Sequence, residues 1–240
     1  SFESGLPSDP VMLGNGSIIG VLLDYDREES SVRVSNTLGR WEPGETEMSL
    51  SYIHRSAEVD LQNPGNSFYQ TAIAFCVLQD GRVVTSSVSI EEYIITCYSP
   101  DGEVDWEISR EYEKHRFCQE ALDMQREAIR ASLRRRGMDP SGADQVPLLE
   151  WTVAVSALYA QGERIWARRT EGMTPLFDIY STEGEFLYSC SVPSLPYGNN
   201  IAFAISPYSS TVLAYHADPE DYCRIWMLQE IDGSTSEQVW

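Results

Sequence analysis

The sequence predicts an all-β fold, a β-propeller of four-stranded antiparallel blades with one helical insertion between blades. Three observations predict it: two segments repeat without a gap, turn residues separate short apolar runs, and a single stretch has helical periodicity. The repeat aligns Ala72 to Trp106 with Ala154 to Tyr188, so that Tyr98, Ser99 and Gly102 match Tyr180, Ser181 and Gly184. Four-stranded repeats of this kind are typical of propeller blades. A β-sandwich has similar strands and turns but does not account for a gapless four-strand repeat.

Four units of this kind are expected, at about residues 10–55, 70–109, 151–192 and 200–231. In the second, Ser99-Pro100-Asp101-Gly102 is a strong turn signal, because Pro comes early and Gly stands where a positive φ is needed. The last unit has three expected strands and then a polar tail. Residues 1–240 are therefore predicted to form a single propeller domain or the C-terminal part of one. Upstream sequence or a partner chain would complete it, because an unprotected blade edge invites aggregation.

The stretch from 113 to 137 is predicted to be a helix inserted between the second and third blades. Its apolar stripe has helical spacing, and Arg134, Arg135 and Arg136 precede Gly137 as an expected C-cap. We expect the stripe to bury against the neighbouring blades, since an isolated helix of this length is marginal in water. The stripe consists of Cys118, Ala121, Leu122, Ala128, Ile129 and Leu133.

Composition excludes several classes of partner. The chain of 240 residues carries 17 Lys and Arg against 37 Asp and Glu, a net charge of -20. This acid excess argues against nucleic-acid binding and against an anionic membrane surface. No apolar run approaches the ~20 residues that span a bilayer. The five cysteines are widely spaced, so we expect buried free thiols rather than a zinc site or a disulfide framework.

The candidate binding residues gather on one predicted face. In a propeller the loops between second and third strands share a face with the connections between blades, and ligands usually bind there. On this face we place Glu92, Arg168, Arg169, His216 and Asp218. The two arginines could clamp a carboxylate or phosphate, or could pair with Glu171 or an acid of a neighbouring blade. His216 is the best general-base candidate, oriented by Asp218 or Asp221, against the alternative of a surface histidine without a role.

A catalytic site is not predicted. The acidic loops offer oxygen ligands that suit calcium, but no EF-hand-like spacing accompanies them, and the simpler interpretation is solvated loops. The three histidines form no H-x-x-x-H or H-x-H pattern, and no G-x-S-x-G nucleophile motif occurs. We therefore expect no required cofactor, with calcium as the cation that the loops would suit.

Three stretches carry a resemblance to a known family. They are EYIITCYSPDGEVDWEISREYEK at 92–114, IWARRT at 165–170 and FDIYSTEGEFL at 177–187. The chain resembles the uncharacterised bacterial six-bladed β-propeller proteins, relatives of the NHL-repeat propellers, over about 68–231. The resemblance implies six blades, where four are counted, and a secreted or periplasmic location. It implies no catalytic residues, because none are established for this group.

The sequence thus predicts a non-catalytic propeller that binds or scaffolds a protein or small-molecule ligand of unknown identity. Docking is expected on the face of the second-to-third strand loops and the helical insertion. The alternative is a calcium-dependent propeller hydrolase or lyase of lactonase-like type. A third hypothesis is a structural subunit whose open blade edge assembles with another chain.

Overall fold

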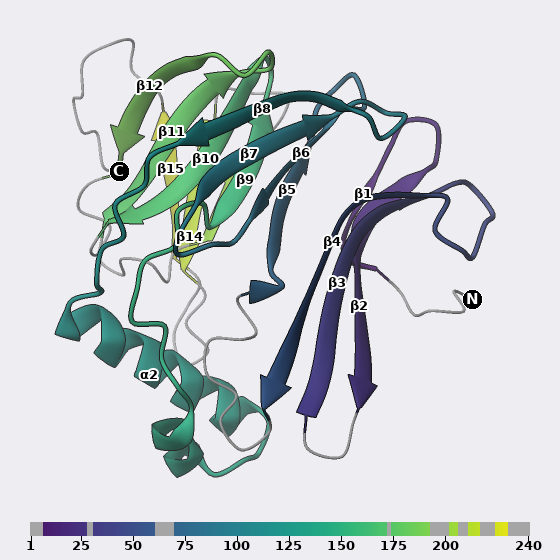
Figure 1. The fold of residues 1–240 in the computed structure, drawn as a ribbon. Helices are drawn as coiled ribbons and strands as arrows, with labels where there is room; N and C mark the ends of the chain where they lie inside the picture. The colour runs from purple at the N-terminus through teal and green to yellow at the C-terminus, as the bar shows by residue number, and fades with distance from the viewer. Residues whose placement is uncertain are drawn as a thin grey trace.

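The computed structural model describes residues 7–27, 31–60, 70–171, 174–192, 202–205, 211–216 and 224–229 (Figure 1). Among these residues, no helix is long and apolar enough to cross a membrane.

The described strands form four antiparallel sheets, and each sheet follows the order of the chain. The predicted all-β fold built of four-stranded antiparallel units is thereby confirmed, and within the described ranges the last unit has three strands, as expected. Sheet 1 contains β1 Ser8–Met12, β2 Ile18–Arg27, β3 Ser31–Trp41 and β4 Leu50–Asp60. Sheet 2 contains β5 Ile73–Val77, β6 Val83–Ser87, β7 Tyr93–Tyr98 and β8 Val104–Arg110. Sheet 3 contains β9 Ala157–Gln161, β10 Arg164–Glu171, β11 Thr174–Ser181 and β12 Phe186–Ser191. Sheet 4 contains β13 Ala202–Ile205, β14 Thr211–His216 and β15 Arg224–Gln229.

The sheets stack face to face in chain order, and three apolar clusters join them. Sheets 1 and 2 meet through a cluster that includes Ile19, Leu38 and Val83. A second cluster joins sheets 2 and 3, and a third joins sheets 3 and 4 around Phe177 and Phe203, whose rings are 5.0 Å apart. The first strands of sheets 2, 3 and 4 are neighbours, because β5 contacts β9 and β9 contacts β13.

Sheet 3 buries both of its faces because successive side chains of a strand point to opposite sides. Ile165 and Ala167 of β10 belong to the cluster shared with sheet 2, whereas Trp166 between them belongs to the cluster shared with sheet 4. All three are almost fully buried. A strand buried on both faces reads as a continuous apolar run rather than an alternating one, as the sequence IWA does here.

At each of the first two sheet-to-sheet contacts, a turn glycine of one sheet packs against a side chain of the preceding sheet. Gly102, in the turn after β7, lies against Leu50 of sheet 1, and Gly184, in the turn after β11, lies against Trp106 of sheet 2. Both glycines have a positive φ, of 87° and 83°. The Trp106 indole also donates from Nε1 to the backbone oxygen of Thr182 at 3.1 Å. The repeated turn glycines therefore serve a local backbone conformation and a contact between sheets at once.

The connections between successive strands alternate between the two ends of the sheets (Figure 1). We call the end with the β1–β2, β3–β4, β5–β6, β7–β8 and β11–β12 connections the turn end. We call the other the loop end; it carries the β6–β7 connection and the segment that leads from sheet 2 to sheet 3.

The helical insertion differs from its prediction in where the helix begins. Helix α2 spans Gln119–Arg135, not residues 113–137. The preceding residues are extended because they pair with the returning chain: Arg116 and Trp151 form a β-bridge, and the Thr152 amide donates to the His115 carbonyl at 2.9 Å. This pairing needs residues that are distant in the sequence, so helical periodicity alone could not locate the boundary.

The helix packs mainly on its own return segment, the 3-10 helix η1 Pro140–Gln145. Gln125 exchanges two hydrogen bonds with the backbone of Leu149, and Arg130 pairs with Asp144 at 2.9 Å. The expectation that the whole stripe buries against the blades is therefore wrong. Of its six members only Ala121 is buried; Leu122, Ile129 and Leu133 are half-buried, while Cys118 and Ala128 are exposed.

Three cysteines in the described part of the chain, Cys76, Cys97 and Cys118, are free thiols, as expected. Full burial was expected too, but only Cys76 and Cys97 are buried. Cys118 is exposed because it stands just before α2, outside any sheet-to-sheet cluster.

The Gly184 contact predicts a difference between two glycine substitutions. Gly162 also has a positive φ, of 56°, but a Cβ there would meet nothing within 4 Å, whereas at Gly184 it would lie 3.0 Å from Trp106. Gly162→Ala should cost about 1 kcal/mol of unfolding free energy from backbone strain alone. Gly184→Ala should cost about 2 kcal/mol or more, because Trp106 must also shift. Urea unfolding of both variants measures the difference, and equal losses would contradict the turn contact.

The buried thiol of Cys97 predicts a loss of stability at alkaline pH. Burial raises its pKa from about 9 to about 12. Between these values the unfolded chain releases a proton that the folded chain retains, so stability falls as the pH rises. Between about pH 9.5 and 11.5, wild type should lose about 1.4 kcal/mol per pH unit more than Cys97→Ala. Cys118→Ser, at an exposed position, serves as the control and should follow wild type in urea unfolding across this range.

Candidate functional site

The structure places the described part of the predicted site at the loop end. Glu92 lies in the connection between β6 and β7, and its side chain is exposed. The backbone N–H of Glu92 donates to the Ser89 hydroxyl at 3.1 Å. It is the neighbouring Glu91 that reaches the insertion, through an ion pair of 2.7 Å with Lys114.

Arg168 and Arg169 do not form one clamp, because they point to opposite faces of sheet 3. Arg169 faces sheet 2, where its Nε lies 3.3 Å from a carboxylate oxygen of Asp178. Arg168 faces sheet 4, with its guanidinium carbon 4.9 Å from the centre of the Phe203 ring. Burial lowers the pKa of Arg168. The strand itself separates the two cations that looked like a pair in the sequence.

His216 is the last residue of β14, where its backbone pairs with Arg224 of β15. This position is at the loop end, as predicted. Its side chain and all of Asp218 lie outside the described residues, so the proposed acid–base pair stays a prediction.

A buried ionic cluster forms at the loop end between sheets 2 and 3, and Asp178 of β11 is its centre. The Asp178 side chain is fully buried. One of its carboxylate oxygens accepts a hydrogen bond from the Ser189 hydroxyl at 2.5 Å. The other lies 3.2 Å from Arg110, at the end of β8, and 3.3 Å from Arg169 of β10. Two guanidinium groups from different sheets therefore share one carboxylate.

Aromatic side chains enclose the same cluster. The Arg110 guanidinium lies 5.5 Å from the Tyr93 ring centre and 4.9 Å from that of Phe186, a sandwich that holds the cation in place. It also donates to the Tyr180 hydroxyl at 3.1 Å, and the hydroxyls of Tyr93 and Tyr180 are 2.9 Å apart. Burial, and then the charge of Asp178, raise the pKa of Tyr93 far above its usual value. Tyr93 is therefore a neutral phenol.

The groups of this cluster are arranged to hold a positive charge in place rather than to catalyse a reaction. Both Asp178 oxygens are engaged by described donors, so this carboxylate is not poised to remove a proton from a substrate. Two cations on one anion leave a local excess of one positive charge. Arg110 is 40% exposed, and that surplus is therefore accessible from outside. In a chain of net charge -20, such a place can hold an anionic group.

The internal repeat shows that the fold does not require these charges. Arg168, Arg169 and Asp178 align with Ser86, Ser87 and Thr96 of sheet 2, which are small and neutral. Both sheets nevertheless form the same four-stranded antiparallel structure. Asp178 was missed by the sequence analysis. The available signal was an acid inside the apolar run LFDIY, at a position where the repeat has Thr96.

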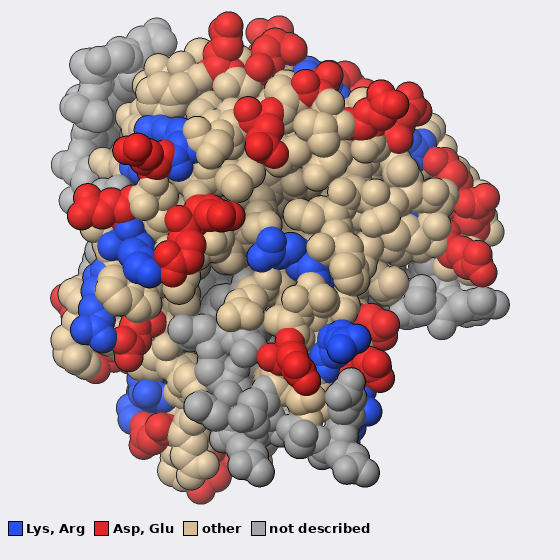
Figure 2. All heavy atoms as spheres, viewed as in Figure 1, with Lys and Arg blue, Asp and Glu red and all other residues tan. Residues whose placement is uncertain are grey.

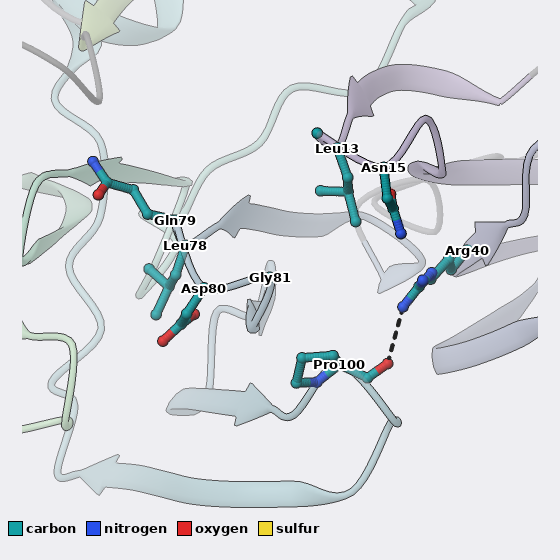
Figure 3. Close-up of a pocket in the computed structure, with 9 residues that line it drawn as sticks. Leu13, Asn15, Arg40, Leu78, Gln79, Asp80, Gly81 and Pro100 are labelled. Carbon is teal, nitrogen blue, oxygen red and sulfur yellow. Dashed lines mark hydrogen bonds between the residues drawn. The ribbon is translucent and has the colours of Figure 1, made fainter.

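A separate pocket of about 280 Å³ lies at the turn end, between sheets 1 and 2 (Figure 3). One wall carries Leu13, Gly14 and Asn15 of the β1–β2 turn together with Arg40 of β3. The opposite wall carries the β5–β6 turn and Pro100. It consists of Leu78, Gln79, Asp80, Gly81 and Pro100. None of the predicted site residues lines it.

Within the described ranges, no group of three or more His, Cys, Asp or Glu side chains is placed to hold a metal ion. Asp218 and Asp221, which belong to the acidic loops expected to suit calcium, lie outside those ranges, so the calcium hypothesis stays a prediction.

Comparison with known proteins finds no protein-family model that matches the chain and no curated protein with a significant sequence match.

The shared Asp178 predicts a large effect from one isosteric change. Asp178→Asn removes the buried charge that the guanidinium groups of Arg110 and Arg169 share, and should cost about 3 kcal/mol of unfolding free energy. Glu150→Gln makes the same change in the Arg116–Glu150 pair, whose side chains are 67% and 53% exposed. It should cost less than about 1 kcal/mol. Urea unfolding at neutral pH compares them, and similar small losses in both would show that Asp178 is not an anchor between sheets.

Proposed function

We propose that the chain forms four consecutive blades of a β-propeller and acts as a non-catalytic module that binds or scaffolds a partner at the loop end. The observation that carries the proposal is the stacking of antiparallel sheets in chain order, with sheet 3 buried on both faces and the first strands of sheets 2, 3 and 4 side by side. Radial stacking of such sheets is the arrangement of propeller blades. The six blades and the NHL-like family implied by the resemblance belong to the same proposal.

The loop end is favoured for docking because it carries features that the repeat does not require. The Arg110–Asp178–Arg169 cluster is present at the contact between sheets 2 and 3, where the repeat-equivalent residues of sheet 2 are Ser87 and Thr96. The helical insertion projects from the same end (Figure 1). Where a residue differs from its repeat equivalent and the fold does not need the difference, the difference is available for binding a partner.

The base of the insertion presents an aromatic platform with two cations. Lys114 and Arg116 lie 5.3 and 5.4 Å from the centre of the Trp151 ring, and both side chains are well exposed. Glu91 and Glu150 pair with these cations. Figure 2 shows carboxylates along the top of the view, and Lys and Arg side chains interspersed with Asp and Glu around the insertion lower down. The insertion thus adds cations to a chain that is acidic as a whole.

The binding proposal rests on how the polar groups of the cluster are used. Asp178 accepts hydrogen bonds from Arg110 and Ser189, Arg110 also donates to the Tyr180 hydroxyl, and that hydroxyl bonds to the one of Tyr93. A general base or nucleophile needs a free lone pair directed at a substrate. A calcium-dependent hydrolase would instead need ligands from loops outside the described residues.

A charge-reversal comparison tests the docking face. Lys114→Glu with Arg116→Glu alters the loop end, whereas Glu103→Lys with Glu185→Lys alters exposed acids of the turn end. Proteins crosslinked to the native chain in its source cells should be lost with the first pair of substitutions and retained with the second. Loss with the turn-end pair alone would place docking at the other end. Chelator-sensitive hydrolysis of lactones by the purified protein would establish the enzymatic alternative instead.

A further inference from the structure

We propose that the turn-end pocket between sheets 1 and 2 binds a carboxylate group. Arg40 would pair with this carboxylate in the way that Arg82 pairs with Glu183 at the contact between sheets 2 and 3. The pocket lies at the opposite end of the sheets from the proposed docking face. The inference therefore stands whether or not the loop end binds a partner.

The contact between sheets 2 and 3 provides the internal template. Arg82, at the turn end of sheet 2, has a side chain only 14% exposed. Its guanidinium receives the carboxylate of Glu183, from the β11–β12 turn of sheet 3, at 2.9 Å. This hydrogen bond is the main reason that the pKa of Arg82 is raised. An acidic side chain from a turn thus meets a mostly buried arginine of the preceding sheet.

One sheet earlier, an arginine again faces the equivalent turn, but without an incoming acid. This arginine, Arg40, comes from β3, and its guanidinium lies beside Ser17, the residue equivalent to Arg82 in the β1–β2 turn. Arg40 is 16% exposed, nearly as buried as Arg82. The turn that faces it contains Pro100 and Asp101, which align with Thr182 and Glu183. Here the turn offers Arg40 the backbone oxygen of Pro100, at 3.3 Å. The carboxylate beside Arg40 is that of Glu42, from its own sheet, at 2.8 Å from Nε.

Arg40 retains donors for a ligand. A guanidinium has five N–H groups. Nε faces Glu42, one amino group donates to Pro100, and the other donates to the Ser17 hydroxyl at 3.3 Å. Each amino group therefore keeps a second N–H beyond these three contacts, and the Tyr52 hydroxyl also lies beside the guanidinium. Two N–H groups of one guanidinium match the two oxygens of a carboxylate.

Asn15 adds a second donor to the same wall. Its side-chain oxygen accepts a hydrogen bond from the Ser17 backbone N–H at 3.0 Å, which leaves the NH2 group for a ligand. Figure 3 shows the Asn15 side chain extending toward the Arg40 guanidinium across the pocket wall. Leu13 and Leu78 supply apolar surface for the methylene groups next to a carboxylate.

The pocket volume limits the size of the ligand. About 280 Å³ corresponds to roughly nine molecules of liquid water, at about 30 Å³ each. This space suits an acidic side chain of a partner chain or a small free carboxylate. Asp80 on the opposite wall is 52% exposed and repels an anion, although Arg82 lies 2.8 Å from it. Binding should therefore be weak, at about 1 mM, and weaker still in salt.

Two nearly isosteric substitutions move the expected affinity in opposite directions. Asn15→Asp keeps the acceptor for Ser17 but adds a negative charge to the pocket, and should weaken binding about fivefold. Asp80→Asn keeps an acceptor for the Arg82 backbone N–H, removes a charge, and should strengthen binding about fivefold. Glu150→Gln makes the same change in net charge at the loop end and should leave binding at the wild-type value. Arg40→Gln should abolish binding.

The measurement is a titration of the full chain followed by NMR, on backbone amides of Gly14 and Gly81 and the side-chain amide of Asn15. Two probes are used: free glutarate, and glutamate blocked as its N-acetyl α-amide. Saturable shifts with the predicted order of variants support the site. Preference for blocked glutamate would indicate an acidic side chain of a partner, and preference for glutarate a free small carboxylate.

The proposal is overturned if neither probe gives saturable shifts, or if Asn15→Asp and Asp80→Asn both bind as wild type does. Equal strengthening by Asp80→Asn and Glu150→Gln would also overturn it, because net charge alone would then explain the effect. The Asn15 and Asp80 variants keep the test decisive even if Arg40→Gln does not fold.

Discussion

Burial of sheet 3 on both faces is the constraint on which the rest of the structure depends. Because side chains alternate along β10, Ile165 must find cover from sheet 2 and Trp166 from sheet 4. This requirement sets the order of the stack and brings the Gly184 turn under Trp106. It also sends Arg168 and Arg169 to different sides of the sheet, each into a contact between sheets.

Charges within these contacts need local compensation. Burying a guanidinium is unfavourable unless it is paired and hydrogen-bonded. At the loop end Arg169 is paired through Asp178, and the same carboxylate serves Arg110 from the neighbouring sheet. At the turn end Arg82 uses Glu183 in the same way. Each end of the interface between sheets 2 and 3 thus has an ion pair that crosses from one sheet to the other, and apolar packing lies between these two ion pairs.

Much of the fold could be predicted from the sequence because its signals are local. Turn residues such as Pro100 and Gly102 and short apolar runs mark the strands, and the repeat relates the sheets to one another. The start of α2 could not be predicted, since it depends on the distant pairing of Arg116 with Trp151. The Asp178 cluster depends equally on which sheet supplies Arg110. The opposite orientation of Arg168 and Arg169, in contrast, was available from the period of two in a strand.

The two faces of sheet 1 show that the stack is not uniform from sheet to sheet. The face that meets sheet 2 is apolar around Ile19 and Leu38. The register of β2, β3 and β4 gives the other face a mixed character: Asp24 lies opposite Ser35, and the side chains of Thr37 and His54 are 2.8 Å apart, whereas Ile18 lies opposite the buried Trp41. A surface packed on that face would have to satisfy Asp24 and Thr37 as well as cover apolar side chains such as Ile18. Such a contact therefore differs in chemistry from those between sheets 1, 2, 3 and 4, whose clusters are apolar.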